Sequence, residues 1–260
     1  MQAKISMQTF GSHQAHELHK VKLLMPALCR VRQGRKVIEW QGRTETADPT
    51  QLIVFPAGYE FHIENIPVSG RYLAEFISIP LSVIKMSHKY SPSVTEKSEA
   101  TRFCSNLTKE LEYCWEQLKV ALGMELAPQL VEHIASGLIL MLRHTGYGNV
   151  LLNIPGTSLA SRCQDLIILS PAFHWTATDM AGHLHMSVST FYRHLAAEGE
   201  TFQTILNDVR LGNALNALQT TDKSVSEIAR DNGYQCPSRF TASFKRRYQI
   251  TPRELRKAIL

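Results

Sequence analysis

The sequence predicts an α+β protein with a β-rich N-terminal domain and an all-helical C-terminal domain. Three observations lead to this fold class: short apolar runs separated by turn residues, a helical period that starts near residue 96, and a series of helix-capping motifs after Trp175. A chain of 260 residues is long enough to form two separate cores.

The N-terminal part, residues 1–95, is predicted to be a β domain. Turn signals such as Asp48-Pro49 and Ser69-Gly70 separate short runs that are rich in Val, Ile, Phe and Tyr. Short strands at this spacing are typical of a sandwich or jelly roll. The predicted strands are Ala27–Gln33, Lys36–Trp40, Gln51–Phe55, Glu60–Glu64 and Arg71–Ile79.

Residues 96–145 are predicted to be helical because apolar side chains recur there at steps of three and four. The spacing of the first apolar stripe is close to a heptad, so it fits either a dimer seam or an intradomain core. The first stripe is Phe103, Leu107, Leu111, Cys114, Leu118 and Ala121, and the second is Leu130, Ile134, Leu138, Met141 and Leu142. Residues 146–161 are rich in Gly, Pro, Ser and Asn and are predicted to be a linker.

The C-terminal part, residues 162–260, contains clear helix starts. Thr176, Ser224 and Thr251 each precede an acidic residue by three positions, which is the spacing of a capping box. These starts predict two pairs of short helices, joined by a long helix over residues 201–219. The pairs cover residues 178–184 with 187–197, and 226–232 with 237–248.

The two pairs repeat one design. Each has a small residue near its turn, Ala181 or Gly233, and then a helix whose outer face is polar. In helix-turn-helix proteins the second helix of such a unit lies in the major groove of DNA. Two such units joined by one rigid helix predict a protein that binds successive major grooves of DNA.

Charge agrees with a polyanionic partner. The formal net charge is +5, and the segment from Arg239 to Lys257 carries seven basic residues against Glu254 alone. A basic solvated helix face is also common, so charge alone leaves both interpretations open. The repeated helix-turn-helix pattern is what favours double-stranded DNA.

The segment from Trp175 to Arg256 resembles the DNA-binding domain of the AraC/XylS family of transcription regulators. The matching motifs are W-T-x-x-D-M-A-x-x-L-x-M-S-x-S-x-F-x-R-x-L at 175–195, E-G-E-T-F at 198–202, R-L-x-x-A-L-x-x-L at 210–218, S-V-S-E-I-A-R-D-N-G-Y at 224–234 and S-R-F-x-x-x-F-K-R-R-Y-x-I-T-P at 238–252. The run L-I-V-F-P-A-G-Y-E-F-H at 52–62 resembles the cupin-like sensor domain of the same family.

The resemblance implies an effector-responsive activator of promoters that forms a homodimer, contacts RNA polymerase and responds to a small-molecule effector. It also favours the dimer seam for the first apolar stripe. By position in the motif, the base-reading residues of the first unit are Ser189, Thr190, Tyr192 and Arg193, and those of the second are Ser238 and Arg239. Phosphate contacts are expected from Lys245, Arg246 and Arg247.

The second unit departs from the family pattern at two places. Ala242 replaces the usual Arg, and Cys236 followed by Pro237 replaces the usual Ser at the helix start. Since Ala242 cannot donate to a base, the second unit is expected to depend on Arg239 and on phosphate contacts.

No pattern predicts a catalytic site, a cofactor or a metal site. His13, His16 and His19 would share one face of a helix, but no carboxylate pattern completes a site, and His62 has no partner in an HxH pair. The pair His183 and His185 lies inside a helix-turn-helix unit. We interpret all of these as surface histidines without a metal.

Two rival functions stay open at this point. One is a cupin-type enzyme with a DNA-binding appendage, and the absence of a metal-ligand pattern argues against it. The other is an interaction protein that has lost DNA binding, for which Ala242 is the one indication. The five cysteines have irregular spacings, and neither a signal peptide nor a membrane-spanning apolar stretch is predicted. A cytoplasmic protein without membrane contact is therefore expected.

Overall fold

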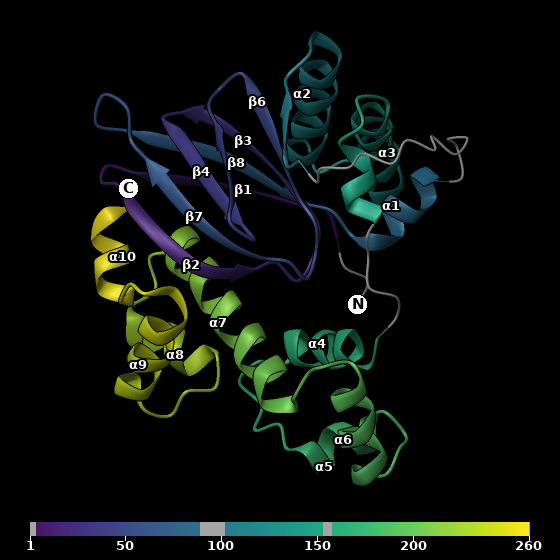
Figure 1. Ribbon diagram of the computed structural model, residues 1–260, viewed down its shortest axis with the longest axis vertical. Coiled ribbons are helices and arrows are strands. Elements are labelled where there is room, and N and C mark those ends of the chain that lie inside the picture. Colours follow the sequence, from purple (N-terminus) through teal and green to yellow (C-terminus); the bar gives the residue numbers. More distant parts are fainter. Residues whose placement is uncertain (1–3, 89–101, 153–157, 260) are drawn as a thin grey trace. The chain divides into compact units, whose positions relative to one another are not determined.

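A computed structural model describes residues 4–88, 102–152 and 158–259 of the chain. The chain divides into two compact units, Met1–Ile154 with Ala258–Leu260, and Pro155–Lys257. Figure 1 shows strands in the first unit and helices throughout the second, which is the α+β arrangement predicted above. Within the described ranges, no helix is both long and apolar enough to span a membrane.

The first unit contains two antiparallel sheets whose inner faces supply its core. The five-stranded sheet has the order β1-β8-β3-β6-β9 and the four-stranded sheet the order β2-β7-β4-β5. The strands are β1 Ser6–Ser12, β2 His16–Lys22, β3 Ala27–Gln33, β4 Arg35–Trp40, β5 Arg43–Ala47, β6 Gln51–Phe55, β7 Glu60–Ile66, β8 Tyr72–Ser78 and β9 Cys104–Asn106.

The five strands predicted from the sequence are all present, as β3, β4, β6, β7 and β8. The four strands that were not predicted, β1, β2, β5 and β9, are the edge strands of the two sheets. Edge strands keep polar residues because an apolar edge invites pairing with other chains. Strand β5, for example, reads RTETA and has no large apolar residue.

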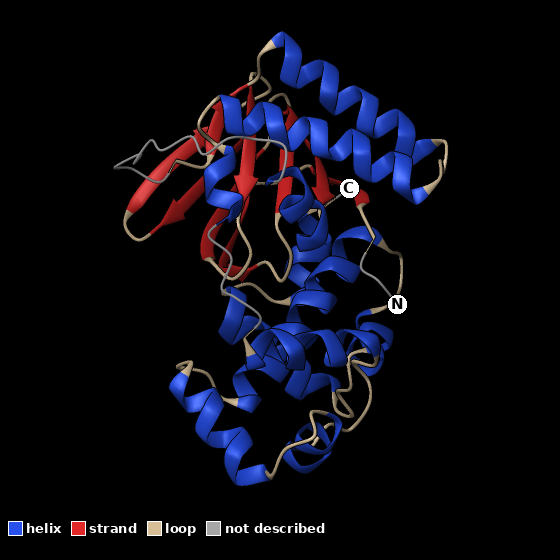
Figure 2. Cartoon of the chain, turned by 90° about the vertical axis from the view of Figure 1, so that its right-hand side faces the viewer, coloured by secondary structure: helices blue, strands red, loops and turns tan. Residues whose placement is uncertain are grey.

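The helices of the first unit are α1 Leu81–His88, α2 Lys109–Gly123 and α3 Pro128–His144, followed by the 3-10 helix η1 Gly148–Leu152. Figures 1 and 2 show α2 and α3 side by side next to the strands. The prediction that Phe103 and Leu107 continue the helical stripe is wrong, because α2 begins only after the cap residue Thr108. The chain around them forms strand β9, which pairs with β6.

The first apolar stripe is core, and its interpretation as a dimer seam is wrong. Leu111, Leu118 and Ala121 of α2 are buried within the single chain. Trp115, which the predicted stripe omits, is buried with them, whereas Cys114 is only half-buried. A helix has only one such face, so this stripe cannot also cover a partner.

Charged residues hold α2 against the five-stranded sheet. Arg30 of β3 donates to Glu112 at 2.5 Å and to Glu116 at 2.9 Å. Glu75 of β8 accepts from Trp115 at 3.1 Å and from Lys119. Burial raises the pKa of Glu75, but the hydrogen bonds from Lys119 and Trp115 outweigh burial, so its pKa lies below the ordinary value.

Two residues of the second stripe are buried, two are half-buried and the first is exposed. Leu138 and Leu142 of α3 are buried, and so are Val131, Ala135 and Ile139. Leu130 is 47% exposed. The buried face is therefore rotated by one residue at the start of the helix.

The segment 146–161 contains more structure than its composition predicts. Within η1, Val150 and Leu151 are buried, and the next helix begins at Leu159. Residues 153–157 lie outside the described residues. The part of the predicted linker that the structure describes therefore belongs to the ends of the two units.

The second unit is all-helical. Its helices are α4 Leu159–Leu169, α5 Ala177–His183, α6 Val188–Ala197, α7 Phe202–Thr220, α8 Val225–Asp231, α9 Pro237–Tyr248 and α10 Pro252–Ala258. Figure 1 shows α4, α5 and α6 near one end of the long helix α7, and α8, α9 and α10 near its other end. This is the predicted pair of helix-turn-helix units joined by a long helix.

Candidate nucleic-acid interface

The first helix-turn-helix unit begins at a capping box. The Thr176 hydroxyl accepts from the amide of Asp179 at 3.1 Å, and the Asp179 carboxylate accepts from the amide of Thr176 at 3.0 Å. The turn between α5 and α6 contains His185 with φ +56°, and α6 is then capped by the Ser187 hydroxyl. These caps set where each short helix starts.

The inner face of this unit is apolar, as its sequence predicts. Met180 and Ala181 of α5 are buried, as are Phe191 and Leu195 of α6. The small Ala181 side chain occupies the position where the two helices approach each other. Because α6 buries these two residues, its opposite face must point outward.

The predicted base-reading residues of the first helix-turn-helix unit occupy that outer face. Ser189 and Arg193 are exposed, and Tyr192 is 52% exposed. Thr190 is half-buried, and its hydroxyl accepts from the Ser187 hydroxyl at 2.9 Å. Three of the four side chains are therefore accessible, and Thr190 is partly engaged in the helix cap.

The second helix-turn-helix unit repeats this construction. Ser224 and Glu227 form a capping box at α8, with distances of 3.2 and 2.8 Å between the bonded atoms. Gly233 in the turn has φ +77°. A side chain there would also clash, since a Cβ atom would lie 2.6 Å from the Arg210 guanidinium.

Helix α9 begins at Cys236 and Pro237. The Cys236 side chain does not cap the helix, and Pro237 occupies a first-turn position where no N–H donor is needed. The Ser238 hydroxyl, 3.4 Å from the Cys236 sulfur, is the largest cause that lowers the pKa of the Cys236 thiol.

The exposed face of α9 is strongly basic. Phe240, Phe244 and Tyr248 are buried, which turns the remaining residues outward. The exposed residues of this face are Ser238, Arg239, Ala242, Lys245 and Arg246. Four of the five predicted DNA-contacting residues of the second helix-turn-helix unit are therefore accessible.

Arg247 differs from the other predicted phosphate contacts. Its guanidinium lies 3.3 Å from the Asp208 carboxylate of α7, and the exposed fractions of the two side chains are only 17% and 6%. This ion pair ties α9 to α7. Arg247 is therefore placed to position the helix, and the accessible phosphate candidates are Lys245 and Arg246.

Two further residues that sequence analysis did not single out stabilise the arrangement. Arg210 of α7 donates to the carbonyls of Pro171 at 2.9 Å and Phe173 at 2.8 Å. Glu198, at the end of α6, accepts from the amides of Leu159 and Ala160 at 2.7 and 2.9 Å and so caps α4. Both residues lie inside motifs quoted above, but their partners are distant in sequence, so spacing could not identify the contacts.

Comparison with known proteins agrees with this geometry. Residues 180–258 match the family described as "Helix-turn-helix domain". The chain is 40% identical over 88 residues to the transcriptional regulator SirC of Salmonella typhimurium, which covers 34% of this chain and 30% of SirC. It is also 40% identical over 91 residues to the urease operon transcriptional activator of Escherichia coli, covering 35% and 31% of the two chains.

The fold of the whole chain matches that of a solved protein. The crystal structure of ToxT from Vibrio cholerae O395 superposes with a TM-score of 0.69 over 97% of each chain, at 13% identity. A crystal structure of apo ToxT from Vibrio cholerae strain SCE256, in a variant with one substitution, gives a TM-score of 0.70 over 99% of this chain and 98% of ToxT, at 12% identity. This likeness concerns the fold, whereas the sequence relatives are matched over about a third of their length. Residues 180–258 thus form a helix-turn-helix domain of the AraC family.

Proposed function

We propose that this chain is a sequence-specific DNA-binding regulator that activates transcription in response to an effector. The observation that carries the proposal is the duplicated unit. Two helices, α6 and α9, each present an exposed polar face, and α7 joins the two units that contain them. Each face carries an exposed arginine, Arg193 or Arg239, and an arginine can donate to O6 and N7 of one guanine.

The names of two relatives support activation, rather than repression, of transcription. One of them is an activator of the urease operon in Escherichia coli, and another is called a transcriptional activator, PerA. We also propose that the chain activates transcription by contacting RNA polymerase at promoter DNA. We propose that it does so in the cytoplasm.

A genome-wide binding map of the full chain tests this function. We expect sites that share one sequence motif with two half-sites about one helical turn apart. A chain in which Arg193 and Arg239 are both alanine should lose the motif and keep weak, salt-dependent binding. If the wild-type map contains no shared motif, the proposal is wrong.

We further propose that the protein acts as a homodimer through the outer face of α2. Tyr113 and Val120 are 66% and 53% exposed, and Met124 after the helix is 66% exposed. Their spacing of seven and four residues places them along one side of α2, opposite the buried stripe. A second copy of this chain would link two such double units and so raise the affinity for a promoter that carries the site twice.

The β domain is proposed as the effector-binding domain. Lys36 is buried there and donates to Asn65 at 2.6 Å, and in the part of the chain that the structure describes no carboxylate pairs with it. Burial lowers the pKa of the Lys36 amine. A carboxylate ligand would supply the negative charge that this buried amine lacks, and one solved ToxT structure is described as bound to an unsaturated fatty acid.

Thermal unfolding tests the effector class. We expect an unsaturated fatty acid to raise the melting temperature of the protein, and the corresponding alcohol to have a smaller effect. The Lys36→Met variant should respond equally to both. Equal shifts for acid and alcohol in the wild-type protein would exclude recognition of the acid by Lys36.

A further inference from the structure

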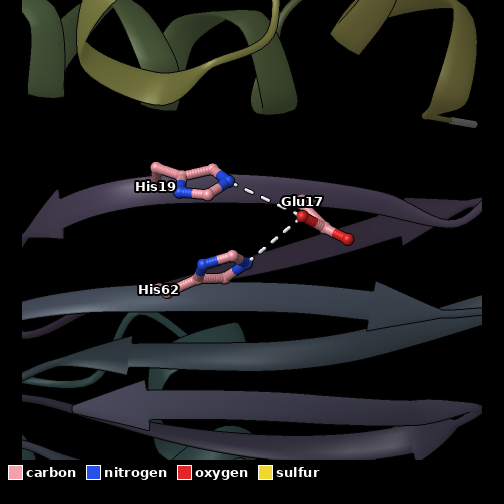
Figure 3. Close-up of side chains that lie close together, drawn as sticks. All are labelled: Glu17, His19 and His62. Carbon is pink, nitrogen blue, oxygen red and sulfur yellow. Dashed lines mark ion pairs between the residues drawn. The ribbon is translucent and has the colours of Figure 1, made fainter. Parts of the chain in front are cut away.

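Three metal-ligating side chains meet on the four-stranded sheet of the β domain. Glu17 and His19 come from β2 and His62 from the neighbouring strand β7 (Figure 3). One ligand atom of each residue lies within 4.8 Å of the others. None of these residues belongs to the DNA interface or to the proposed effector site.

The cluster lies on the outer face of the sheet. Leu18 and Val21 on β2, and Phe61 and Ile63 on β7, point into the core and are buried. The residues between them must point outward because side chains alternate along a strand. The exposed fractions of the Glu17, His19 and His62 side chains are 55%, 37% and 29%.

A β-bulge brings the two histidines together. The register of β2 against β7 shifts between Leu18 and Val21, so that His19 and Lys20 both lie opposite His62. Lys20 has φ +49°, a conformation that a non-glycine residue adopts at a cost. The result is that the His19 and His62 rings lie 3.9 Å apart between centroids.

We propose that Glu17, His19 and His62 bind a divalent transition-metal ion of the Zn²⁺ type. The Glu17 carboxylate lies 3.6 Å from Nε2 of His19 and 3.4 Å from Nε2 of His62. These distances are long for hydrogen bonds. They are close to the separation of about 3.3 Å between two ligand atoms that each lie about 2.0–2.1 Å from one tetrahedral zinc ion.

The donor set selects the class of ion. Imidazole nitrogens favour zinc, nickel and copper, whereas calcium and magnesium favour sites made of oxygen. Three protein ligands leave the fourth position of a tetrahedral ion for water. The ion would join the two strands on which the ligands lie.

The charges around the cluster also suit a cation. Glu64 pairs with Glu17 across β2 and β7, and Glu39 pairs with His62 across β4 and β7. Both neighbours are carboxylates on the outer face, and Lys20 is the basic residue closest along the strand. A doubly charged ion would offset the repulsion between these acidic groups.

Metal titration of the full chain tests the site. The protein is stripped with a chelator and titrated with Zn²⁺ by calorimetry at pH 7.5, and with Co²⁺ as an absorbing probe. Loss of a residue that only orients a ligand costs about 10–100-fold in metal affinity, so loss of a ligand should cost more than about 100-fold. We expect this loss in His19→Ala, His62→Ala and Glu17→Gln.

The exposed His133 of α3 provides the matched control, and His133→Ala should bind metal as the wild type does. Zn²⁺ should raise the melting temperature of the wild type and of this control, but not that of His19→Ala or His62→Ala.

Three results would overturn the proposal. The first is no metal binding by the wild-type chain at pH 7.5. The second is unchanged affinity in both His19→Ala and His62→Ala, with circular dichroism showing that both are folded. The third is a thiolate charge-transfer band in the Co²⁺ spectrum, which would assign the ion to cysteines instead.

Discussion

Single residues at the helix starts make the stability of the C-terminal domain depend on pH. Hydrogen bonds from the side chain and backbone of Ser224 lower the pKa of Glu227, and Thr176 lowers the pKa of Asp179 in the same way. A carboxylate whose pKa is lower in the folded state stabilises that state above its unfolded pKa. The stabilisation is lost as the pH falls through the folded pKa.

We therefore predict that the C-terminal domain loses stability below about pH 4.5, where unfolded carboxylates take up protons. Glu227→Gln keeps an acceptor for the amide of Ser224 but removes the titration. Its urea midpoint should lie below that of the wild type at pH 7, and the two should converge as the pH falls. Asp222→Asn, outside the capping boxes, is the control of equal charge. Parallel pH curves for wild type and Glu227→Gln would contradict this reasoning.

We expect base reading and phosphate binding to be separable at single residues of the proposed interface. Arg193→Ala should cost about 1–3 kcal/mol at one base position of the site and relax specificity there. Lys245→Ala should weaken binding to all sequences alike and reduce the salt slope by about one. Fluorescence anisotropy measures both effects, on DNA that carries the motif from the binding map and on random DNA. If Arg193→Ala weakens both DNAs equally, its assignment as a base reader is wrong.

The turns between short helices depend on glycine where the backbone is left-handed and crowded. Gly233 has φ +77°, and a Cβ atom there would meet Arg210 and the carbonyl of Pro171. We predict that Gly233→Ala destabilises the C-terminal domain by about 1–3 kcal/mol. Denaturant unfolding measures this change.

Gly212, inside α7, is the matched control because a Cβ atom there meets nothing within 4 Å. Gly212→Ala should stabilise the domain by about 0.5–1 kcal/mol, since alanine favours helix. A similar loss in both variants would mean that the left-handed backbone and the crowding at Gly233 do not explain its effect.

The buried and the exposed face of α2 are expected to respond differently to substitution. Leu118 is fully buried, so Leu118→Ala should destabilise the β domain by about 2–5 kcal/mol. Val120 is 53% exposed, so Val120→Asp should leave the domain folded and convert the proposed dimer to a monomer. Sedimentation with circular dichroism distinguishes these outcomes. A dimer that survives Val120→Asp would exclude this face as the seam.

At the scale of the whole molecule, the C-terminal unit should fold without the N-terminal one. Helix α4 begins after the cap residue Ser158, and its buried residues Cys163 and Ile167 belong to the same compact unit as α7. We predict that a fragment of residues 158–260 is helical by circular dichroism and binds DNA that carries the motif from the binding map.

A fragment of residues 171–260 is the control, because it lacks α4 and leaves Glu198 without the two amides that it caps. It should unfold at a lower temperature than the longer fragment. Equal melting temperatures would show that α4 is not part of the domain core.

The class of the fold, the central strands and the polar outer faces of α6 and α9 all follow from sequence alone. Central strands and paired short helices repeat their apolar residues at fixed periods, and periodicity is a local property that a single sequence displays. The capping boxes at Thr176 and Ser224 were likewise predictable, because all of their atoms lie within four consecutive residues.

Which partner each periodic face contacts depends instead on how the chain packs. The spacing of Leu111 and Leu118 fits a seam or a core equally, and burial within the single chain shows that it is core. Arg247 carries the positive charge expected of a phosphate contact, yet it forms an ion pair with Asp208. His19 and His62 meet only because β2 pairs with β7. Each of these contacts joins residues that are distant in sequence. A local sequence pattern does not determine which distant helix or strand packs against a given face.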